Sequence, residues 1–257
     1  MRARVVTALL LAGIVGLASA CGPSGSGSAS PSGPSGAITV FAASSLNAAF
    51  TTIGADFEKS HPGTMVRFSF AGSSSLAAQI QEGALGDVFA SADQPNMQKL
   101  VQAGLTAESP MVFARNDLEI VVAKGNPKHI ASLADLARSG LVIVLCAPAV
   151  PCGHYAAQAL QKAGVSVKPA SQEADVKSVL SKVALGEADA GIVYVTDVKA
   201  AGQSVEGVAI APALNVVAEY PIVILKDSQN RALARAFISY VHTGGRETLA
   251  RYGFTNP

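Results

Sequence analysis

Short apolar runs rich in β-branched residues alternate with stretches of helical period along almost the whole chain after residue 37. This alternation is the feature that most restricts the fold. Runs of this length and composition are typical of buried strands. We predict strands at Ile38–Phe41, Val66–Phe70, Asp87–Ala90, Leu118–Ala123, Leu141–Leu145, Val165–Val167, Ala190–Val195, Val205–Ile210 and Tyr220–Leu225. Strands that alternate with helices indicate the α/β class, with mostly parallel sheets and helices on both faces.

Apolar residues at helical spacing lie between the predicted strands. In the first helix, Leu46, Phe50, Ile53 and Phe57 recur every three or four positions, and His61–Gly63 ends the pattern. We predict further helices around Leu76–Ile80, Met97–Val101, Leu133–Leu136, Tyr155–Gln161, Val176–Leu185, Arg231–Val241 and Gly245–Tyr252.

Two successive α/β sets within about 220 residues are too many for one small sheet, so the sequence predicts two lobes. We expect residues 37–119 and 217–257 to form lobe 1, and residues 120–216 to form lobe 2. The segments Leu118–Ala123 and Val216–Leu225 are long enough to cross between the lobes. In open α/β sheets a ligand binds in the crevice at the carboxyl ends of the strands, so we expect a site there.

The N-terminus has the pattern of an export signal. Two arginines in Met1–Arg4 precede the apolar run Val5–Leu17 and three small residues, which predicts a secretory signal peptide over residues 1–20. Cys21 follows at once and resembles the cysteine of a bacterial lipoprotein box, although that box usually has leucine where this chain has Ala18. We expect Cys21 to be lipidated and to anchor the protein on the extracytoplasmic face of the cell membrane. The alternative is an ordinary cleaved signal followed by an incidental cysteine.

The segment after Cys21 is built only from small or turn-forming residues. Gly22–Gly36 contains Gly, Pro, Ser and Ala, a composition that cannot bury enough apolar surface to fold. We therefore expect a flexible tether, with the folded chain beginning near Ala37.

Charge and cysteine content narrow the possible partners. Loss of residues 1–20 removes Arg2 and Arg4 and leaves 17 basic residues against 18 acidic ones, which argues against a nucleic-acid partner. The four histidines are scattered and no CxxC motif occurs, so no metal site is indicated. Cys146 and Cys152 are six positions apart in an exported protein, and we expect a disulfide, with a buried free pair as the alternative.

Runs of serine occur twice where a predicted strand leads into a helix. These runs are VFAASSL in Val40–Leu46 and FAGSSSL in Phe70–Leu76. One serine oxygen can cap the helix by accepting from a free backbone N–H group. Each run has a further hydroxyl, and a hydroxyl beside free N–H groups at the positive end of a helix suits an anion. Both interpretations, cap and anion ligand, stay open at this point.

Three later segments have the same character. Pro151–Gly153 opens a helix, Asp175 is a suitable N-cap that leaves the Val176 N–H free, and the strand AGIVY ends in Tyr194. Each has an ordinary structural explanation by itself, as a cap or a core residue. Together they offer N–H and O–H donors to one cleft. No Arg or Lys lies in these loops, and Lys177 is the nearest cation.

Seven segments in order resemble the family of periplasmic molybdate-binding proteins of molybdate ABC transporters, the ModA family. They are ITVFAASSL, FAGSSSLAAQIQEGALGDVFASAD, VPCGHYAAQALQKAG, EADVKSVL, GIVYVTD, EYPIVI and RYGF. The resemblance covers Ile38–Phe254. It implies a two-lobed, class II substrate-binding protein that closes over a tetrahedral oxyanion by a hinge motion and delivers it to a membrane permease.

The resemblance also implies the ligand set. Matched by motif, the oxyanion-binding residues are Ser45, Ser73, Cys152, Val176 and Tyr194, the third and fourth through their backbone N–H groups. In the family the position of Cys152 is usually alanine, and the segment Cys146–Val150 is shorter than the family pattern.

We therefore expect a monomeric binding protein for molybdate and tungstate. It would have no cofactor, no catalytic residue and no direct protein ligand to molybdenum. A pocket that only donates hydrogen bonds disfavours a protonated anion such as hydrogen phosphate. Sulfate is also an unprotonated dianion at neutral pH, so the donors do not disfavour it, and it is the alternative ligand. A serine hydrolase is the alternative from another class, but Gly72–Leu76 lacks the second glycine of GxSxG.

Overall fold

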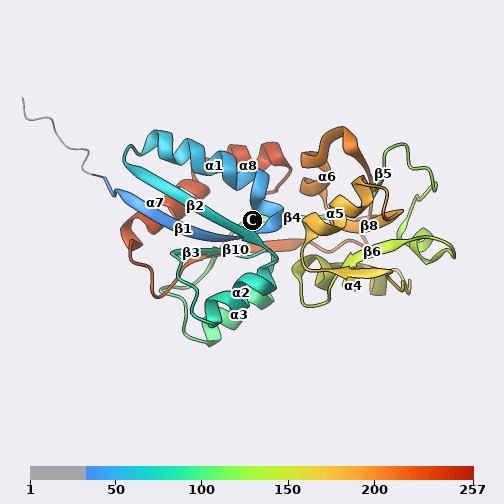
Figure 1. Ribbon diagram of the computed structural model, residues 1–257, viewed down its shortest axis with the longest axis horizontal. Helices are drawn as coiled ribbons and strands as arrows, with labels where there is room; N and C mark the ends of the chain where they lie inside the picture. Colours follow the sequence, from blue (N-terminus) through green and yellow to red (C-terminus); the bar gives the residue numbers. More distant parts are fainter. Residues whose placement is uncertain (1–32) are drawn as a thin grey trace, which may run out of the picture. The chain divides into compact units, whose positions relative to one another are not determined.

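The computed structural model describes residues 33–257, which contain two five-stranded sheets with helices packed on them (Figure 1). The predicted signal peptide, Cys21 and the tether up to residue 32 lie outside the described residues. The first strand already begins at Gly36, whose N–H donates to the carbonyl of Gly63 at 2.9 Å. The predicted tether was therefore one residue too long at this end.

Lobe 1 is built on a sheet of strand order β2-β1-β3-β10-β4. The strands are β1 (Gly36–Ala43), β2 (Thr64–Ala71), β3 (Val88–Ala90), β4 (Met111–Asn116) and β10 (Ala218–Ile224). Strand β1 pairs in parallel with β2 and β3, whereas β10 runs antiparallel to both β3 and β4. Four strands of this sheet therefore point the same way and one points against them.

Lobe 2 is built on a sheet of strand order β7-β6-β8-β5-β9. The strands are β5 (Leu118–Ala123), β6 (Ile143–Cys146), β7 (Ser171–Glu173), β8 (Ala190–Tyr194) and β9 (Val205–Ala209). Strand β6 is parallel to β7 and β8, and β5 is antiparallel to β8 and β9. As in lobe 1, the single antiparallel strand is the one that the chain enters from the other lobe. The expected two-lobed α/β fold of class II is thus confirmed, with one antiparallel strand in each otherwise parallel sheet.

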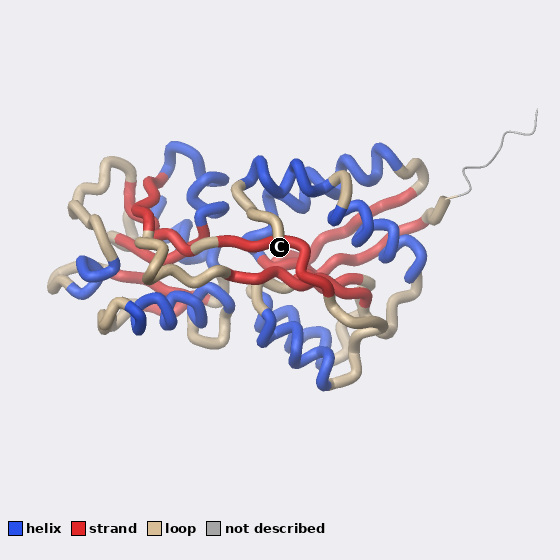
Figure 2. Tube along the Cα trace, turned by 180° about the vertical axis from the view of Figure 1, so that it is seen from behind, coloured by secondary structure: helices blue, strands red, loops and turns tan. Residues whose placement is uncertain are grey.

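The chain crosses between the lobes twice, from β4 into β5 through Asp117 and from β9 into β10 (Figure 2). The two crossing segments are hydrogen-bonded to each other. Asn215 accepts from the Leu118 N–H at 3.1 Å and donates to the Leu118 carbonyl at 2.9 Å. A pair of linked crossings of this kind is the structural basis of a hinge.

Helices cover both sheets. Lobe 1 carries the 3₁₀ turn η1 (Ser44–Leu46), α1 (Asn47–Ser60), α2 (Ser73–Gln81), α3 (Gln94–Gln102), α7 (Arg231–His242) and α8 (Gly245–Tyr252). Lobe 2 carries η2 (Leu133–Ala137), α4 (Pro151–Lys162), α5 (Val176–Ala184), α6 (Val195–Ala201) and η3 (Gly202–Ser204). None of the helices in residues 33–257 is long and apolar enough to cross a membrane.

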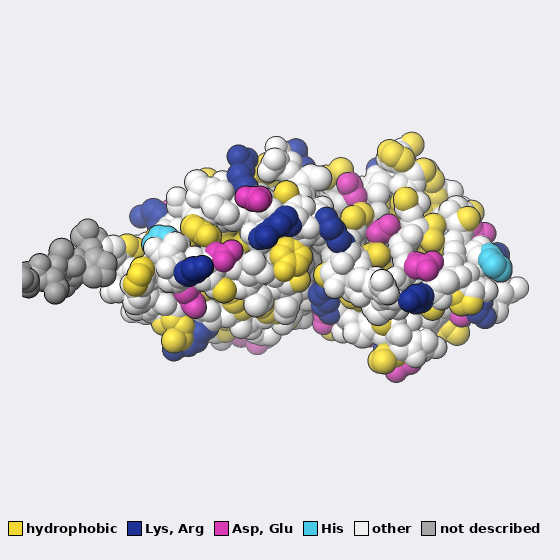
Figure 3. Space-filling view, turned by 90° about the horizontal axis from the view of Figure 1, so that it is seen from above, with side chains coloured by type: hydrophobic (Ala, Val, Ile, Leu, Met, Phe, Trp, Pro, Cys, Tyr) yellow, Lys and Arg dark blue, Asp and Glu magenta, His cyan; other side chains and the backbone are white. Residues whose placement is uncertain are grey.

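The predicted apolar face of the first helix is buried. Leu46, Phe50, Ile53 and Phe57 are all fully inaccessible, and Phe57 packs edge-on against Phe237 of α7 with ring centroids 5.5 Å apart. The face shown in Figure 3 carries acidic and basic side chains interspersed over both lobes, in keeping with a net charge near zero.

Some predicted elements were wrong or missing. No strand forms at Val165–Val167, because the Val165 N–H donates to Leu160 at the end of α4 and the segment continues as a loop. The outer neighbour of β6 is instead the polar segment Ser171–Glu173 at the edge of the sheet. An exposed edge strand needs no apolar run, so the apolar pattern could not reveal it. Strand β4 and helix α6 were also not predicted.

Candidate functional site: an uncharged pocket between the lobes

A small pocket lies between the two lobes. Its lining residues are Ala43, Ser44, Ser45, Gly72, Ser73, Ala92, Val150, Pro151, Cys152, Val176 and Tyr194. All five residues that the sequence analysis singled out therefore line one pocket. Its volume open to a water-sized sphere is about 10 Å³, close to the room that a single water needs, whereas pockets for drug-sized organic ligands measure about 300–1,000 Å³. The volume fits a compact ion better than a sugar or a peptide.

The pocket lies where several helical segments begin. Ser44, Ser73, Pro151 and Val176 are the first residues of η1, α2, α4 and α5, and Tyr194 directly precedes α6. The first N–H groups of a helix have no partner within the helix, and they lie at its positive end. Unpaired N–H groups of this kind are the donors that suit an anion.

The serine runs do not cap helices. The N-cap of η1 is Ala43 and that of α2 is Gly72, and at neither helix start does a capping side chain accept a hydrogen bond from the backbone. The capping interpretation is therefore wrong for both runs. Ser45 and Ser73 are instead buried with 6% and 1% of their surface exposed, and both line the pocket.

The Oγ atoms of Ser45 and Ser73 each have one hydrogen-bond partner among residues 33–257. The Ser73 Oγ accepts from the backbone N–H of Ala92 at 3.0 Å. The Ser45 Oγ lies 3.0 Å from the Oη of Tyr220 on β10. These bonds hold both side chains in place at the edge of the pocket.

Tyr194 supplies a third hydroxyl. Its side chain is buried, and its Oη has no hydrogen-bond partner among the described residues. Burial raises the pKa of the Tyr194 phenol well above its usual value, so the group stays protonated and can donate at neutral pH. A buried donor without a partner is costly, and a ligand in the pocket would relieve that cost.

Lobe 2 also contributes backbone donors. The N–H groups of Cys152 and Val176 lie in the first turns of α4 and α5, and neither has a hydrogen bond to another described residue. Asp175 is the N-cap of α5 and accepts from the Ser178 N–H at 3.0 Å, which confirms its predicted role. The Asp175 carboxylate is thus bound to its own helix.

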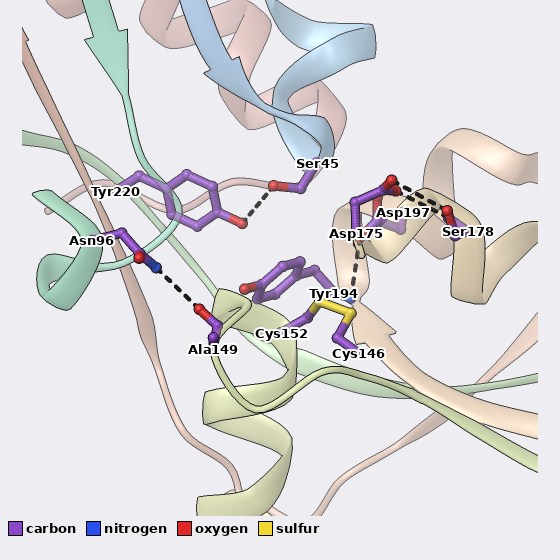
Figure 4. The surroundings of a disulfide bond; sticks show 10 residues. All are labelled: Ser45, Asn96, Cys146, Ala149, Cys152, Asp175, Ser178, Tyr194, Asp197 and Tyr220. Atoms are coloured by element: carbon purple, nitrogen blue, oxygen red, sulfur yellow. Dashed lines mark hydrogen bonds between the residues drawn. A yellow bond between two sulfur atoms is a disulfide. The ribbon is translucent and has the colours of Figure 1, made fainter. Parts of the chain in front are cut away.

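Cys146 and Cys152 are joined by a disulfide bond, with their Cα atoms 5.8 Å apart. The bond links the end of β6 to the first turn of α4 and so closes the loop of residues 147–151. In Figure 4, Tyr194 lies between Ser45 of lobe 1 and this disulfide of lobe 2. The disulfide restrains the loop that presents the Cys152 N–H to the pocket.

Within the described part of the chain, no Lys, Arg, His, Asp or Glu lines the pocket. Lys177, the nearest cation expected from the sequence, forms an ion pair with the fully buried Asp197 at 3.0 Å. The Asp197 carboxylate also accepts from the backbone N–H of Tyr194 at 3.2 Å. The positive charge of Lys177 is thereby balanced outside the pocket, and the donors inside it stay neutral.

The two lobes touch beside the pocket. The Asn96 Nδ2 of lobe 1 donates to the Ala149 carbonyl of lobe 2 at 3.4 Å (Figure 4). A Cβ atom on Gly72 would lie only 2.3 Å from the Ala174 carbonyl oxygen of lobe 2. Glycine is therefore required at position 72 for the lobes to approach this closely. The two lobes are thus in direct contact beside the pocket.

Comparisons with known proteins agree with this geometry. The sequence model for the bacterial extracellular solute-binding protein family matches residues 38–255. The molybdate-binding protein ModA of Mycobacterium tuberculosis is 47% identical over 257 residues, which cover 98% of this chain and 97% of that protein. The chain belongs to the ModA family of extracellular solute-binding proteins.

Solved structures support the fold of this ModA-family chain. The periplasmic molybdate-binding protein of Azotobacter vinelandii superposes with a TM-score of 0.73 at 23% identity, covering 86% of this chain and 99% of that chain. The sulfate-binding protein SubI of M. tuberculosis gives a TM-score of 0.76 at 20% identity, covering 86% of each chain. At these identities the likeness shows the shared fold alone.

Some lining and neighbouring residues of this family member were not singled out from the sequence. Ser44 and Ala92 line the pocket, Gly72 permits the lobes to meet, and Tyr220 holds Ser45. Ser44 and Gly72 lie in the serine runs, and Ala92 lies near the end of the segment FAGSSSLAAQIQEGALGDVFASAD. The Tyr220 contact joins residues 175 positions apart, and no local pattern predicts it.

Proposed function

We propose that the pocket binds molybdate, and with it tungstate, as the substrate-binding component of an ABC importer. The observation that carries this proposal is a small pocket in which hydroxyl and backbone donors meet at four helix starts without any cation. The name of the 47% identical relative from M. tuberculosis points to the same ligand.

The donor set decides which anions fit. Ser45, Ser73 and Tyr194 supply hydroxyls from both lobes, and Cys152 and Val176 supply N–H groups. A fully deprotonated tetrahedral dianion accepts from every one of these donors. A hydrogen phosphate ion would direct its own O–H at a donor and leave that donor unpaired, at a cost of about 1–3 kcal/mol.

Hydrogen bonds to an anion can replace a counter-ion here. Each bond between a neutral donor and a charged acceptor contributes about 1.5–3 kcal/mol. Five such bonds in a pocket shielded from water disperse the two negative charges over both lobes. Since the donors come from both lobes, the anion is held fully only when the lobes are closed.

The proposed cellular location of the protein rests on its family and on its N-terminal sequence. Extracellular solute-binding proteins work outside the cytoplasm, and we propose that a lipid on Cys21 anchors this one at the outer face of the cell membrane. We further propose that it acts as a monomer without cofactor or catalytic activity, and that it hands the oxyanion to the membrane permease of the importer.

Sulfate is the second candidate ligand. It is also a fully deprotonated tetrahedral dianion at neutral pH, and SubI, which has the same fold, is a sulfate-binding protein. The donor set does not discriminate sulfate from molybdate, so discrimination must come from the fit of the larger molybdate ion to the pocket.

Calorimetric titration of the exported protein with molybdate, tungstate, sulfate and phosphate tests the proposal. We expect one molybdate per protein, tungstate bound with similar affinity, sulfate bound at least about 100-fold more weakly, and phosphate hardly bound. Sulfate binding as tight as molybdate binding would favour the second candidate. Tight phosphate binding would refute the argument from the donors.

A further inference from the structure

A chain of buried hydrogen bonds runs from the hinge to the pocket. The Asn116 Nδ2, at the end of β4 where the chain crosses to lobe 2, donates to the Tyr220 Oη at 3.3 Å and to the Thr196 Oγ1 at 2.8 Å. The Tyr220 Oη in turn lies 3.0 Å from the Ser45 Oγ. Tyr220 is fully buried and does not itself line the pocket.

The orientation of the Asn116 amide sets the direction of its hydrogen bonds in this chain. The Asn116 Oδ1 accepts from the backbone N–H of Asp117 at 3.1 Å, which fixes the orientation of the amide and makes its Nδ2 the donor. Tyr220 receives a hydrogen bond from this Nδ2, so its own O–H is free to point to the Ser45 Oγ. With Tyr220 as the donor to the Ser45 Oγ, the Ser45 hydrogen is left for the pocket.

Ser73 is oriented by the same principle. Its Oγ accepts from the backbone N–H of Ala92, a group that can only donate, so the Ser73 hydrogen is also left for the pocket. The Tyr194 hydroxyl has no acceptor among the described residues. The Ser45 and Ser73 hydroxyls are therefore set as donors before any ligand arrives, and the Tyr194 hydroxyl is free to donate.

We propose that Tyr220 is a positioning residue for the bound oxyanion. It does not touch the ligand, and it acts by fixing the Ser45 hydroxyl as a donor. This inference rests on the proposed function. The orientation of the Tyr220 hydroxyl depends on Asn116. Without the hydrogen bond from the Asn116 Nδ2, the Tyr220 hydroxyl could turn and accept from Ser45. Burial raises the pKa of Tyr220, so its hydroxyl keeps its proton at neutral pH.

Tyr220→Phe tests this role, because it removes the hydroxyl and almost no volume. We expect molybdate to bind about 5- to 20-fold more weakly, since Ser45 loses both its fixed orientation and the polarisation from the chain. Tyr252→Phe is the matched control. It removes a hydroxyl that pairs with the Thr52 Oγ1 at 2.9 Å outside the pocket, and molybdate affinity should not change.

A double-mutant cycle separates positioning from a structural role. In a Ser45→Ala background the added Tyr220→Phe change should weaken molybdate binding by less than about 2-fold. The Ser45 hydroxyl, through which Tyr220 acts on the ligand, is already absent from this background. An equal loss with and without Ser45 would overturn the proposal, as would unchanged affinity in Tyr220→Phe alone. If the unmodified protein binds no molybdate, the proposed function fails instead, so the two failures can be told apart.

Discussion

Gly72→Ala is expected to reduce the affinity for molybdate by roughly a thousandfold while leaving each lobe folded. The backbone at Gly72 has φ −60° and ψ 137°, which alanine adopts without strain. The added Cβ would lie 2.3 Å from the Ala174 carbonyl oxygen when the lobes are closed. Without closure the anion loses the Cys152, Val176 and Tyr194 donors, and three charge-assisted bonds of about 1.5 kcal/mol or more account for the estimate.

Calorimetry and thermal unfolding of the same preparation measure this effect. Ser75→Ala, on the first turn of the same helix, is the control, because the Ser75 hydroxyl makes no hydrogen bond with the described residues and does not line the pocket. Both variants should unfold near the temperature of the unmodified protein without ligand. Near-normal molybdate affinity in Gly72→Ala would show that the closed contact at Ala174 is not needed for binding.

Tyr194→Phe is expected to change affinity and stability in opposite directions. The hydroxyl is buried without a protein partner, so its removal should leave the ligand-free protein as stable as before or raise its Tm by about 2–4 °C. Molybdate affinity should fall by about 5- to 150-fold, the equivalent of 1–3 kcal/mol, because one donor to the anion is lost. Thermal unfolding with and without molybdate, together with calorimetry, gives both quantities.

If the Tyr194 hydroxyl had only a structural role, the opposite changes in stability and affinity would be expected. The phenyl ring would still pack against Tyr220, whose ring centroid is 5.9 Å away, so packing should survive the change. If Tyr194→Phe lowers the Tm and leaves molybdate affinity unchanged, the hydroxyl supports the fold and is not a ligand.

Much of the fold could be predicted from the sequence, because most helices and strands have a local pattern of apolar residues. Helix α1 was predicted from four apolar residues at helical spacing, and all four are buried. Strand β8 was predicted within one residue from the buried segment AGIVY. Strand β7 was missed because its three residues are polar and lie at the edge of a sheet, where no apolar pattern is required. Periodicity thus predicts elements that bury a face and overlooks those that do not.

The residues that line the candidate site could be predicted from the sequence better than the contacts that hold them in place. The motifs of the family resemblance pointed to five residues that the fold brings to one pocket. That these residues bind an oxyanion stays a prediction. The capping role of the serines was wrong, because Gly72 and Ala43 occupy the cap positions and the serine oxygens bond to residues far along the chain. Long-range partners such as Tyr220 are set by tertiary packing and leave no local signature.

Locating the ligand directly tests the central claim that an uncharged donor pocket between the lobes holds the oxyanion. The measurement is a crystal structure of the exported protein grown with molybdate, with the anomalous signal of molybdenum used to find the ion. The account predicts one strong peak in the pocket, with oxygens in hydrogen-bond reach of the Ser45, Ser73 and Tyr194 hydroxyls and of the Cys152 and Val176 N–H groups. A peak at any other place on the protein, or an empty pocket between closed lobes at saturating molybdate, would contradict it.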